Sequence, residues 1–101
     1  MSKRFEALAS LVDTKKVYDV GCDHGLLSIM LAKNHDVYAS DITDTSVATA
    51  IKNIKAANLN IPVIKSDGLD NLDIDANSTL ILAGMGCFTI LKILILNQIS
   101  L

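Results

Sequence analysis

Short apolar runs alternate with segments of helical spacing along the chain, and this alternation constrains the fold more than any other feature. The runs at 16–20, 36–40, 61–65 and 79–83 combine β-branched, aliphatic and tyrosine side chains and are typical of buried strands. Strands joined by helices pack as a parallel sheet with right-handed crossovers. The sequence therefore predicts an α/β fold with parallel strands in the order 3-2-1-4 and flanking helices. Pro62, near the start of the third run, favours a place at the sheet edge.

Apolar residues at three- and four-residue intervals predict three helices before strand four. A first helix is expected from the spacing within residues 5–12. Asp23 is expected to cap a second helix that ends at Lys33, and Thr43 or Asp44 can cap a third. The expected core stripe of the third helix consists of Val47, Ala50, Ile51, Ile54 and Ala57.

The most apolar part of the chain follows strand four. Residues 88–96 predict a helix, although a fifth strand could instead begin at Leu94. Residues 80–96 resemble a membrane span in hydropathy, but two glycines and Lys92 indicate the strand, loop and helix of a soluble sheet protein.

Strand four is expected to have an unpaired edge, so we expect self-association or a partner chain. The apolar side chains that need cover are Phe88, Ile90, Leu91, Leu94 and Ile95.

Composition limits the partners and the setting of the chain. A chain of 101 residues, 50% of them hydrophobic, can form one core, so residues 1–101 are expected to be a single, partial domain. With a net charge of -2 and widely spaced aromatic residues, the chain has no basic stripe and no stacking platform for RNA. Two cysteines, Cys22 and Cys87, are too few for a disulfide scaffold and indicate a reducing, cytoplasmic setting.

The segment D-V-G-C-D-H-G at residues 19–25 follows the first strand and carries the strongest functional signal. Glycines at its third and last positions let the backbone approach a ligand closely. A dinucleotide-binding G-x-G-x-x-G pattern would need glycine where Asp23 and Leu26 stand, and a carboxylate there repels a pyrophosphate. The loop therefore disfavours a nicotinamide dinucleotide.

S-Adenosylmethionine fits the same loop better. Its ammonium and sulfonium groups are cationic and are expected near Asp19 and Asp23, while its carboxylate can accept N–H groups at the helix start. Asp41, at the end of the second strand, can accept the ribose hydroxyls, and Asp67-Gly68, after the third strand, can accept the adenine amino group. Each of these positions could instead be only a helix-entry or turn residue.

Three further side chains near the strand ends have open roles. His24 could orient substrate or cofactor, or it could only cap a helix or face solvent. Cys22, His24 and Cys87 could approach one another, but without a paired C-x-x-C motif the sequence disfavours zinc. Small apolar packing is the favoured role of both cysteines.

Three motifs resemble those of a known family. Residues 18–27, Y-D-V-G-C-D-H-G-L-L, resemble the D-I-G-[SC]-D-H-[AG]-x-L signature of the TrmK family of bacterial tRNA adenine-N1 methyltransferases. Residues 80–86, L-I-L-A-G-M-G, are similar to that family's I-A-G-M-G-G segment, and residues 66–69, S-D-G-L, resemble its turn after strand three. Cys87 departs from the family, which usually has a second glycine there, and the family's later strands and C-terminal helical extension are missing.

The resemblance implies a truncated, Rossmann-like class I methyltransferase fold that transfers a methyl group from S-adenosylmethionine to N1 of the adenine at position 22 of tRNA. The neutral N1 lone pair can attack the sulfonium methyl directly, so no general base is required. His24, Gly84 and Met85 are the candidates for shaping the methyl-transfer pocket, and no metal is expected. The residues expected to bind the cofactor are Asp19, Gly21, Cys22, Asp23, His24, Gly25, Asp41, Ile42, Asp67, Gly68, Ala83 and Gly84.

Two rival functions follow from the same residues. A truncated, catalytically inactive module that binds S-adenosylmethionine or a nucleoside would need a partner chain, because the substrate side of the predicted crevice is missing. A fragment of a nicotinamide-dependent oxidoreductase ranks last, because the loop lacks the glycine pattern of that class.

Overall fold

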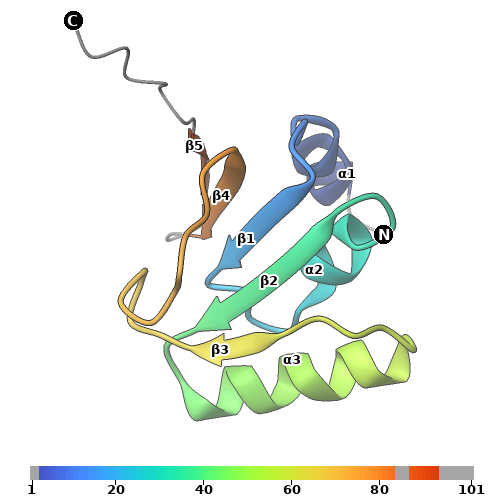
Figure 1. Ribbon diagram of the computed structural model, residues 1–101. Helices are drawn as coiled ribbons and strands as arrows, with labels where there is room; N and C mark the ends of the chain where they lie inside the picture. Colours follow the sequence, from blue (N-terminus) through green and yellow to red (C-terminus); the bar gives the residue numbers. More distant parts are fainter. Residues whose placement is uncertain (1–2, 84–86, 94–101) are drawn as a thin grey trace, which may run out of the picture.

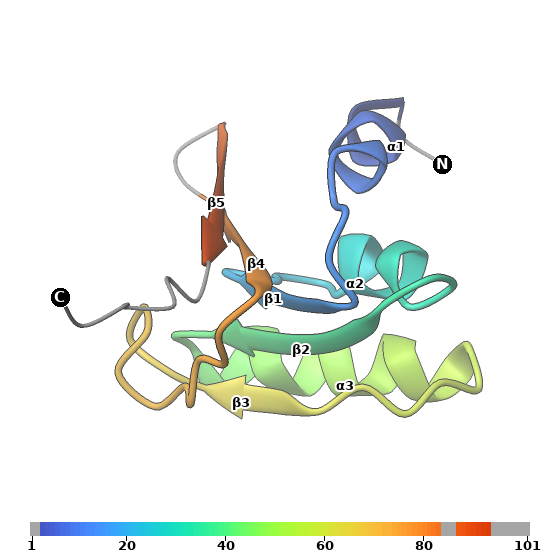
Figure 2. The same ribbon diagram turned by 45° about the horizontal axis from the view of Figure 1, so that its top comes forward.

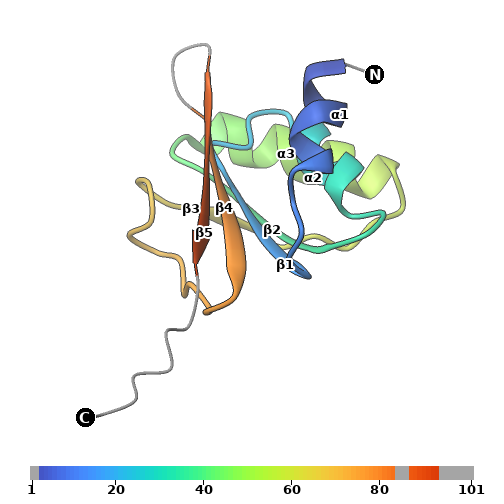
Figure 3. The same cartoon turned by 90° about the horizontal axis from the view of Figure 1, so that it is seen from above.

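The computed structural model describes residues 3–83 and 87–93, which form one five-stranded sheet with three helices on one of its faces (Figures 1 and 3). The strands are β1 (Lys16–Val20), β2 (Asp36–Asp41), β3 (Val63–Lys65), β4 (Ser78–Ala83) and β5 (Phe88–Ile93). The helices are α1 (Lys3–Ser10), α2 (Leu26–Leu31) and α3 (Asp44–Ala56). The strand order is β3-β2-β1-β4-β5, in which β1 to β4 are parallel and β5 is antiparallel to β4. The predicted order of the first four strands and the edge position of β3 are confirmed.

Strand β1 lies in the middle of the sheet and sets the level of its two neighbours. Val20 lies opposite Ser40 of β2 and Leu82 of β4. The chain therefore leaves β1 at the level of the last residues of β2 and β4, Asp41 and Ala83. In parallel α/β sheets this carboxyl edge is where ligands bind.

The main core lies between the sheet and the helices. Val17 of β1 and Ile81 of β4 are fully buried and belong to one apolar cluster with Leu31 of α2 and Ala50 of α3. Figure 2 shows α2 and α3 packed behind β1 and β2. Because alternate residues of a strand face the same side, Val17 and Ile81 lie on the helix side of the sheet, while Tyr18 and Leu80 lie on the other.

Helix α3 follows its predicted signals with two exceptions. Thr43 caps the helix, because its side chain accepts a backbone N–H of the first turn at 3.1 Å. Ala50 and Ile54 are buried as predicted, but Ile51 and Ala57 are exposed. Ile51 directly follows Ala50 and lies about 100° further around the helix, and Ala57 lies beyond the last helical residue.

The opposite face of the sheet is covered by the segment 66–77 and by no helix among the described residues (Figure 3). The Tyr18 hydroxyl donates to the main-chain oxygen of Asp73 at 2.9 Å and accepts the N–H of Asp75 at 3.0 Å. These two bonds fix the segment against the centre of the sheet. The face is therefore closed by a loop where α/β sheets usually carry helices.

Residues 88–93 form strand β5, so the predicted helix over 88–96 is wrong in its described part. The strand pairs with β4 along six residues of each strand. Half of its residues are β-branched, which favours a strand, and the pairing satisfies backbone groups along the β4 edge. The expectation of an unpaired β4 edge is therefore wrong as well. The alternative strand start at Leu94 lies outside the described residues.

The apolar stretch at 80–96 is not helical where it is described. Residues 80–83 belong to β4, and residues 88–93 are β5. Within 3–83 and 87–93, no helix reaches the length and hydropathy needed to cross a bilayer.

We predict that the chain self-associates through the exposed apolar part of β5. Leu91 of β5 is 44% exposed and pairs with Leu80, which belongs to the cluster on the face that segment 66–77 covers. Leu91→Lys is expected to shift the mass measured by light scattering towards the 10.8 kDa of one chain, because a charge there opposes apolar association. Leu11→Lys, at an exposed leucine just after α1, should leave the mass unchanged. A wild-type chain that stays monomeric at every concentration would contradict the prediction.

Candidate functional site

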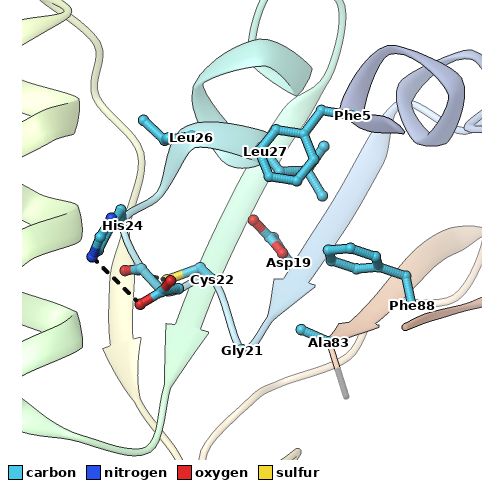
Figure 4. Close-up of a pocket in the computed structure, with 10 residues that line it drawn as sticks. Phe5, Asp19, Gly21, Cys22, His24, Leu26, Leu27, Ala83 and Phe88 are labelled. Carbon is cyan, nitrogen blue, oxygen red and sulfur yellow. Dashed lines mark hydrogen bonds and ion pairs between the residues drawn. The ribbon is translucent and has the colours of Figure 1, made fainter. Parts of the chain in front are cut away.

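A pocket of about 190 Å³ opens at the carboxyl edge of the sheet, beside the ends of β1 and β4 (Figure 4). The end of β1 and the loop that follows form its polar side, and α1, α2, β4 and β5 supply its apolar side. The lining residues are Phe5, Asp19, Gly21, Cys22, Asp23, His24, Leu26, Leu27, Ala83 and Phe88. The pocket thus brings together residues from two strand ends that the sequence predicted to bind the cofactor.

The loop after β1 has a backbone that its sequence explains. Gly21 has a φ of +79°, and a Cβ at this position would lie 3.0 Å from the Cβ of Ala83, so the close approach of the two strand ends requires glycine. Gly25 has a φ of +80° and directly precedes α2, which begins at Leu26. Asp23 also has a positive φ, of 50°. The N-cap of α2 is Gly25 and no side chain makes a cap hydrogen bond, so the prediction that Asp23 caps α2 is wrong.

Asp19 is a buried carboxylate inside the pocket. Its side chain accepts a hydrogen bond from the Ser28 hydroxyl at 2.6 Å. Burial raises the pKa of Asp19 to about 6, and the neighbouring Asp41 carboxylate acts in the same direction. At neutral pH the pocket therefore holds a negative charge that has been removed from water.

Asp41 ties the end of β2 to the loop after β1. One carboxylate oxygen accepts the N–H of Asp23 at 2.9 Å, and the other accepts the N–H of Ile42 at 2.8 Å. The main-chain N–H groups of Gly21 and Cys22 both donate to the main-chain oxygen of Ser40 in β2. Ile42 itself is 54% exposed, so its backbone is held here while its side chain stays outside.

The turn after β3 lies beside Asp41 rather than in the pocket. The Ser66 N–H donates to the main-chain oxygen of Asp41 at 2.9 Å. The Ser66 hydroxyl donates to the main-chain oxygen of Gly68 and accepts the N–H of Asn71, which holds Asp67 and Gly68 in an exposed turn. The structure therefore groups these two predicted residues with Asp41 and leaves them outside the pocket lining.

The histidine and the cysteines differ in their surroundings. His24 has a 61% exposed side chain at the pocket, with Nε2 3.8 Å from the Asp23 carboxylate. Burial and nearby carboxylates raise the pKa of Cys22 to about 12, which keeps this thiol protonated and fits apolar packing. Cys87 is exposed, just before an edge strand, so the packing prediction is wrong for this residue.

Among the residues described, no group of three or more His, Cys, Asp or Glu side chains is placed to hold a metal ion.

Some site residues lie outside the described chain, and others were missed. Gly84 and Met85, both candidates for the methyl-transfer pocket, fall outside the described residues. Sequence reasoning missed Phe5 and Phe88, whose rings meet edge to face with centroids 6.2 Å apart, because only folding joins α1 to β5. Ser28 was missed too, although a lone hydroxyl within an apolar helical run could have signalled a buried polar partner.

Comparison with known proteins relates the chain to methyltransferases. A family model described as a methyltransferase domain matches residues 1–100. The chain is 35% identical over 102 residues to MG248 of Mycoplasma genitalium, a protein provisionally assigned as a tRNA methyltransferase; the match covers 93% of this chain and 46% of that protein. The chain therefore spans less than half the length of this relative.

Two solved structures share the fold. TrmK of M. capricolum, solved with S-adenosyl-homocysteine, has a TM-score of 0.66 and 32% identity, covering 79% of this chain and 40% of that chain. Streptococcus pneumoniae Sp1610, provisionally described as a tRNA (m1A22) methyltransferase, has a TM-score of 0.65 and 30% identity, covering 72% of this chain and 36% of that chain. These similarities confirm the Rossmann-like fold and the resemblance to TrmK. Because the family model matches nearly every residue, the chain belongs to the methyltransferase domain family.

Proposed function

We propose that the chain binds S-adenosylmethionine across three neighbouring strand ends. The pocket beside Asp19 takes the methionine part, Asp41 accepts the ribose hydroxyls, and Asp67-Gly68 accepts the adenine amino group. The hydrogen bonds of Asp41 support this assignment. Its carboxylate accepts an N–H from the loop after β1, and its main-chain oxygen accepts an N–H from the turn after β3. The solved TrmK of M. capricolum holds the cofactor product S-adenosyl-homocysteine, which supports the same ligand class.

The buried Asp19 carboxylate is the observation that carries the proposal. Asp19 is 1% exposed, and among the ten described residues that line the pocket there is no Lys or Arg. A ligand ammonium group would supply the missing positive charge, whereas a pyrophosphate would add negative charge beside Asp19 and Asp23. The residues present therefore fit a cationic amino-acid ligand.

The proposed reaction is methyl transfer to N1 of adenine 22 in tRNA. The bound cofactor supplies an electrophilic sulfonium methyl group. The residues of the chain align the reactants and keep water away, with Phe5, Leu26 and Phe88 as the apolar wall and His24 at the polar side. Support for the tRNA substrate comes from the relatives, since M. capricolum TrmK and Sp1610 match most of this chain.

A second candidate is a cofactor-binding module that works with another polypeptide. The chain matches 46% of the length of MG248, and the described sheet has helices on one face only. A net charge of -2 gives the chain little attraction for a phosphate backbone, so RNA contacts would come from the partner. Methylation of tRNA by the isolated chain would favour the enzyme over the module.

We expect the purified chain to bind S-adenosyl-homocysteine in calorimetric titration. Asp41→Asn should weaken binding at least tenfold, because it removes the charge that accepts the ribose hydroxyls. Asp36→Asn is the matched control, since Asp36 is exposed at the opposite end of the same strand. Equal loss in both variants, or no binding by a folded wild-type chain, would rule out the proposed site.

We also expect Asp19→Asn to stabilise the chain while weakening cofactor binding. The folded pKa of about 6 lies above the ordinary aspartate value of 3.8, so the folded state holds the proton more tightly and its stability falls as pH rises from about 4 to 6. At pH 8 the substitution should raise the free energy of unfolding by up to about 3 kcal/mol. The gain should shrink through pH 5 and nearly vanish at pH 4.

Denaturant unfolding at pH 8 and pH 4 measures this gain, and titration with S-adenosyl-homocysteine at pH 8 measures affinity. Ser28→Ala removes the neutral partner of the same carboxylate and should lower stability at pH 8. A gain for Asp19→Asn that is the same at both pH values would show that the charge of Asp19 is not the cause.

A further inference from the structure

Helix α3 contacts the loop after β1 at two successive positions of one helix face. The side-chain amide of Asn53 donates to the main-chain oxygen of His24 at 2.8 Å. One turn earlier, the fully buried Ala50 lies against Gly25, where an added Cβ would be 3.3 Å from the Ala50 Cβ. Residues three apart share a helix face, so α3 presents one continuous surface to the loop.

The bond from Asn53 holds a peptide group between two residues of left-handed backbone. Asp23 has a φ of 50° and Gly25 a φ of +80°, and the peptide that joins His24 to Gly25 lies between them. Its N–H donates to the main-chain oxygen of Cys22 at 2.8 Å, and its carbonyl accepts the Asn53 amide. Both polar ends of this peptide are therefore engaged, which fixes its plane.

The other anchor of the loop comes from β2. The Asp23 N–H donates to the Asp41 carboxylate at 2.9 Å, so β2 holds the Cys22–Asp23 peptide, while α3 holds the His24–Gly25 peptide. Asp23 is a non-glycine residue in a backbone region that such residues rarely adopt, and this conformation persists only where neighbours enforce it. Since His24 and Asp23 both line the pocket, the orientation of these peptides decides which groups the pocket presents.

We propose that Asn53 is a positioning residue for the cofactor loop, acting through the His24 carbonyl. It does not itself line the pocket, and it holds the left-handed Asp23-to-Gly25 backbone in the form that receives S-adenosylmethionine. The inference rests on the proposed function for its binding consequence, but the effect on the loop itself is independent of any ligand.

Two variants test the role of Asn53. Asn53→Asp keeps the shape but replaces the donor by an acceptor that repels the His24 carbonyl, and Asn53→Ala removes the donor alone. We expect the dissociation constant for S-adenosyl-homocysteine to rise about tenfold in the first variant and about threefold in the second. Lys52→Ala, an exposed neighbour on the same helix, should bind like wild type.

Amide hydrogen exchange of the ligand-free chain gives a second readout. The amides of Asp23 and Gly25 should exchange faster in Asn53→Asp and Asn53→Ala, while the amides of β1 keep the wild-type rates. A purely structural bond would instead change the melting temperature and the exchange of all elements together, with affinity unchanged well below that temperature. That result would overturn the proposal.

The two readouts separate this inference from the proposed function. If the folded wild-type chain does not bind S-adenosyl-homocysteine, the proposed function fails, and the exchange rates alone decide the role of Asn53. If wild type binds and both variants bind equally well with unchanged exchange at Asp23 and Gly25, the proposed function stands and the positioning role is refuted.

Discussion

The in-register pairing of β1 with β2 on one side and β4 on the other is the constraint on which the site depends. Because Val20 is level with Ser40 and Leu82, the loop after β1 must emerge between Asp41 and Ala83. Parallel strands place all their carboxyl ends on one edge, so chemistry that is scattered along the sequence converges without a long-range motif. A single-residue slip of β1 would turn Asp19 away from the helix side and remove it from the pocket.

The buried charge of Asp19 lowers the stability of the folded chain. Asp19 lies under α2 with its charge largely removed from water, and the nearby Asp41 adds a second negative charge. Ser28 offsets part of this cost through the hydrogen bond from its hydroxyl. Because no Lys or Arg is among the described residues that line the pocket, a cationic ligand suits this carboxylate, in agreement with the cofactor class.

Strand order, the carboxyl-edge site and its polar residues could be predicted from the sequence, because apolar period and strand-end residues are local signals. Residues 88–93 were predicted wrongly, because a short apolar run suits a strand or a helix equally and the open β4 edge decided between them. Asp23 does not cap α2, because Gly25 takes the cap position and the Asp23 N–H is held by Asp41, 18 residues later in the chain. Phe5, Phe88 and Asn53 reach the site only through tertiary packing, which leaves no trace in sequence spacing.

Titration of the ¹⁵N-labelled chain with S-adenosyl-homocysteine would examine the claim that three strand ends form one cofactor site. Chemical shifts should change at the amides of Gly21, Asp23, Asp41 and Asp67 and leave the opposite edge of the sheet unaffected. That edge carries a second pocket, of about 330 Å³, lined in part by Asn60 and Ile61. Shift changes centred on that second pocket, or none in a chain with a folded spectrum, would contradict a cofactor site at the carboxyl ends of β1, β2 and β3.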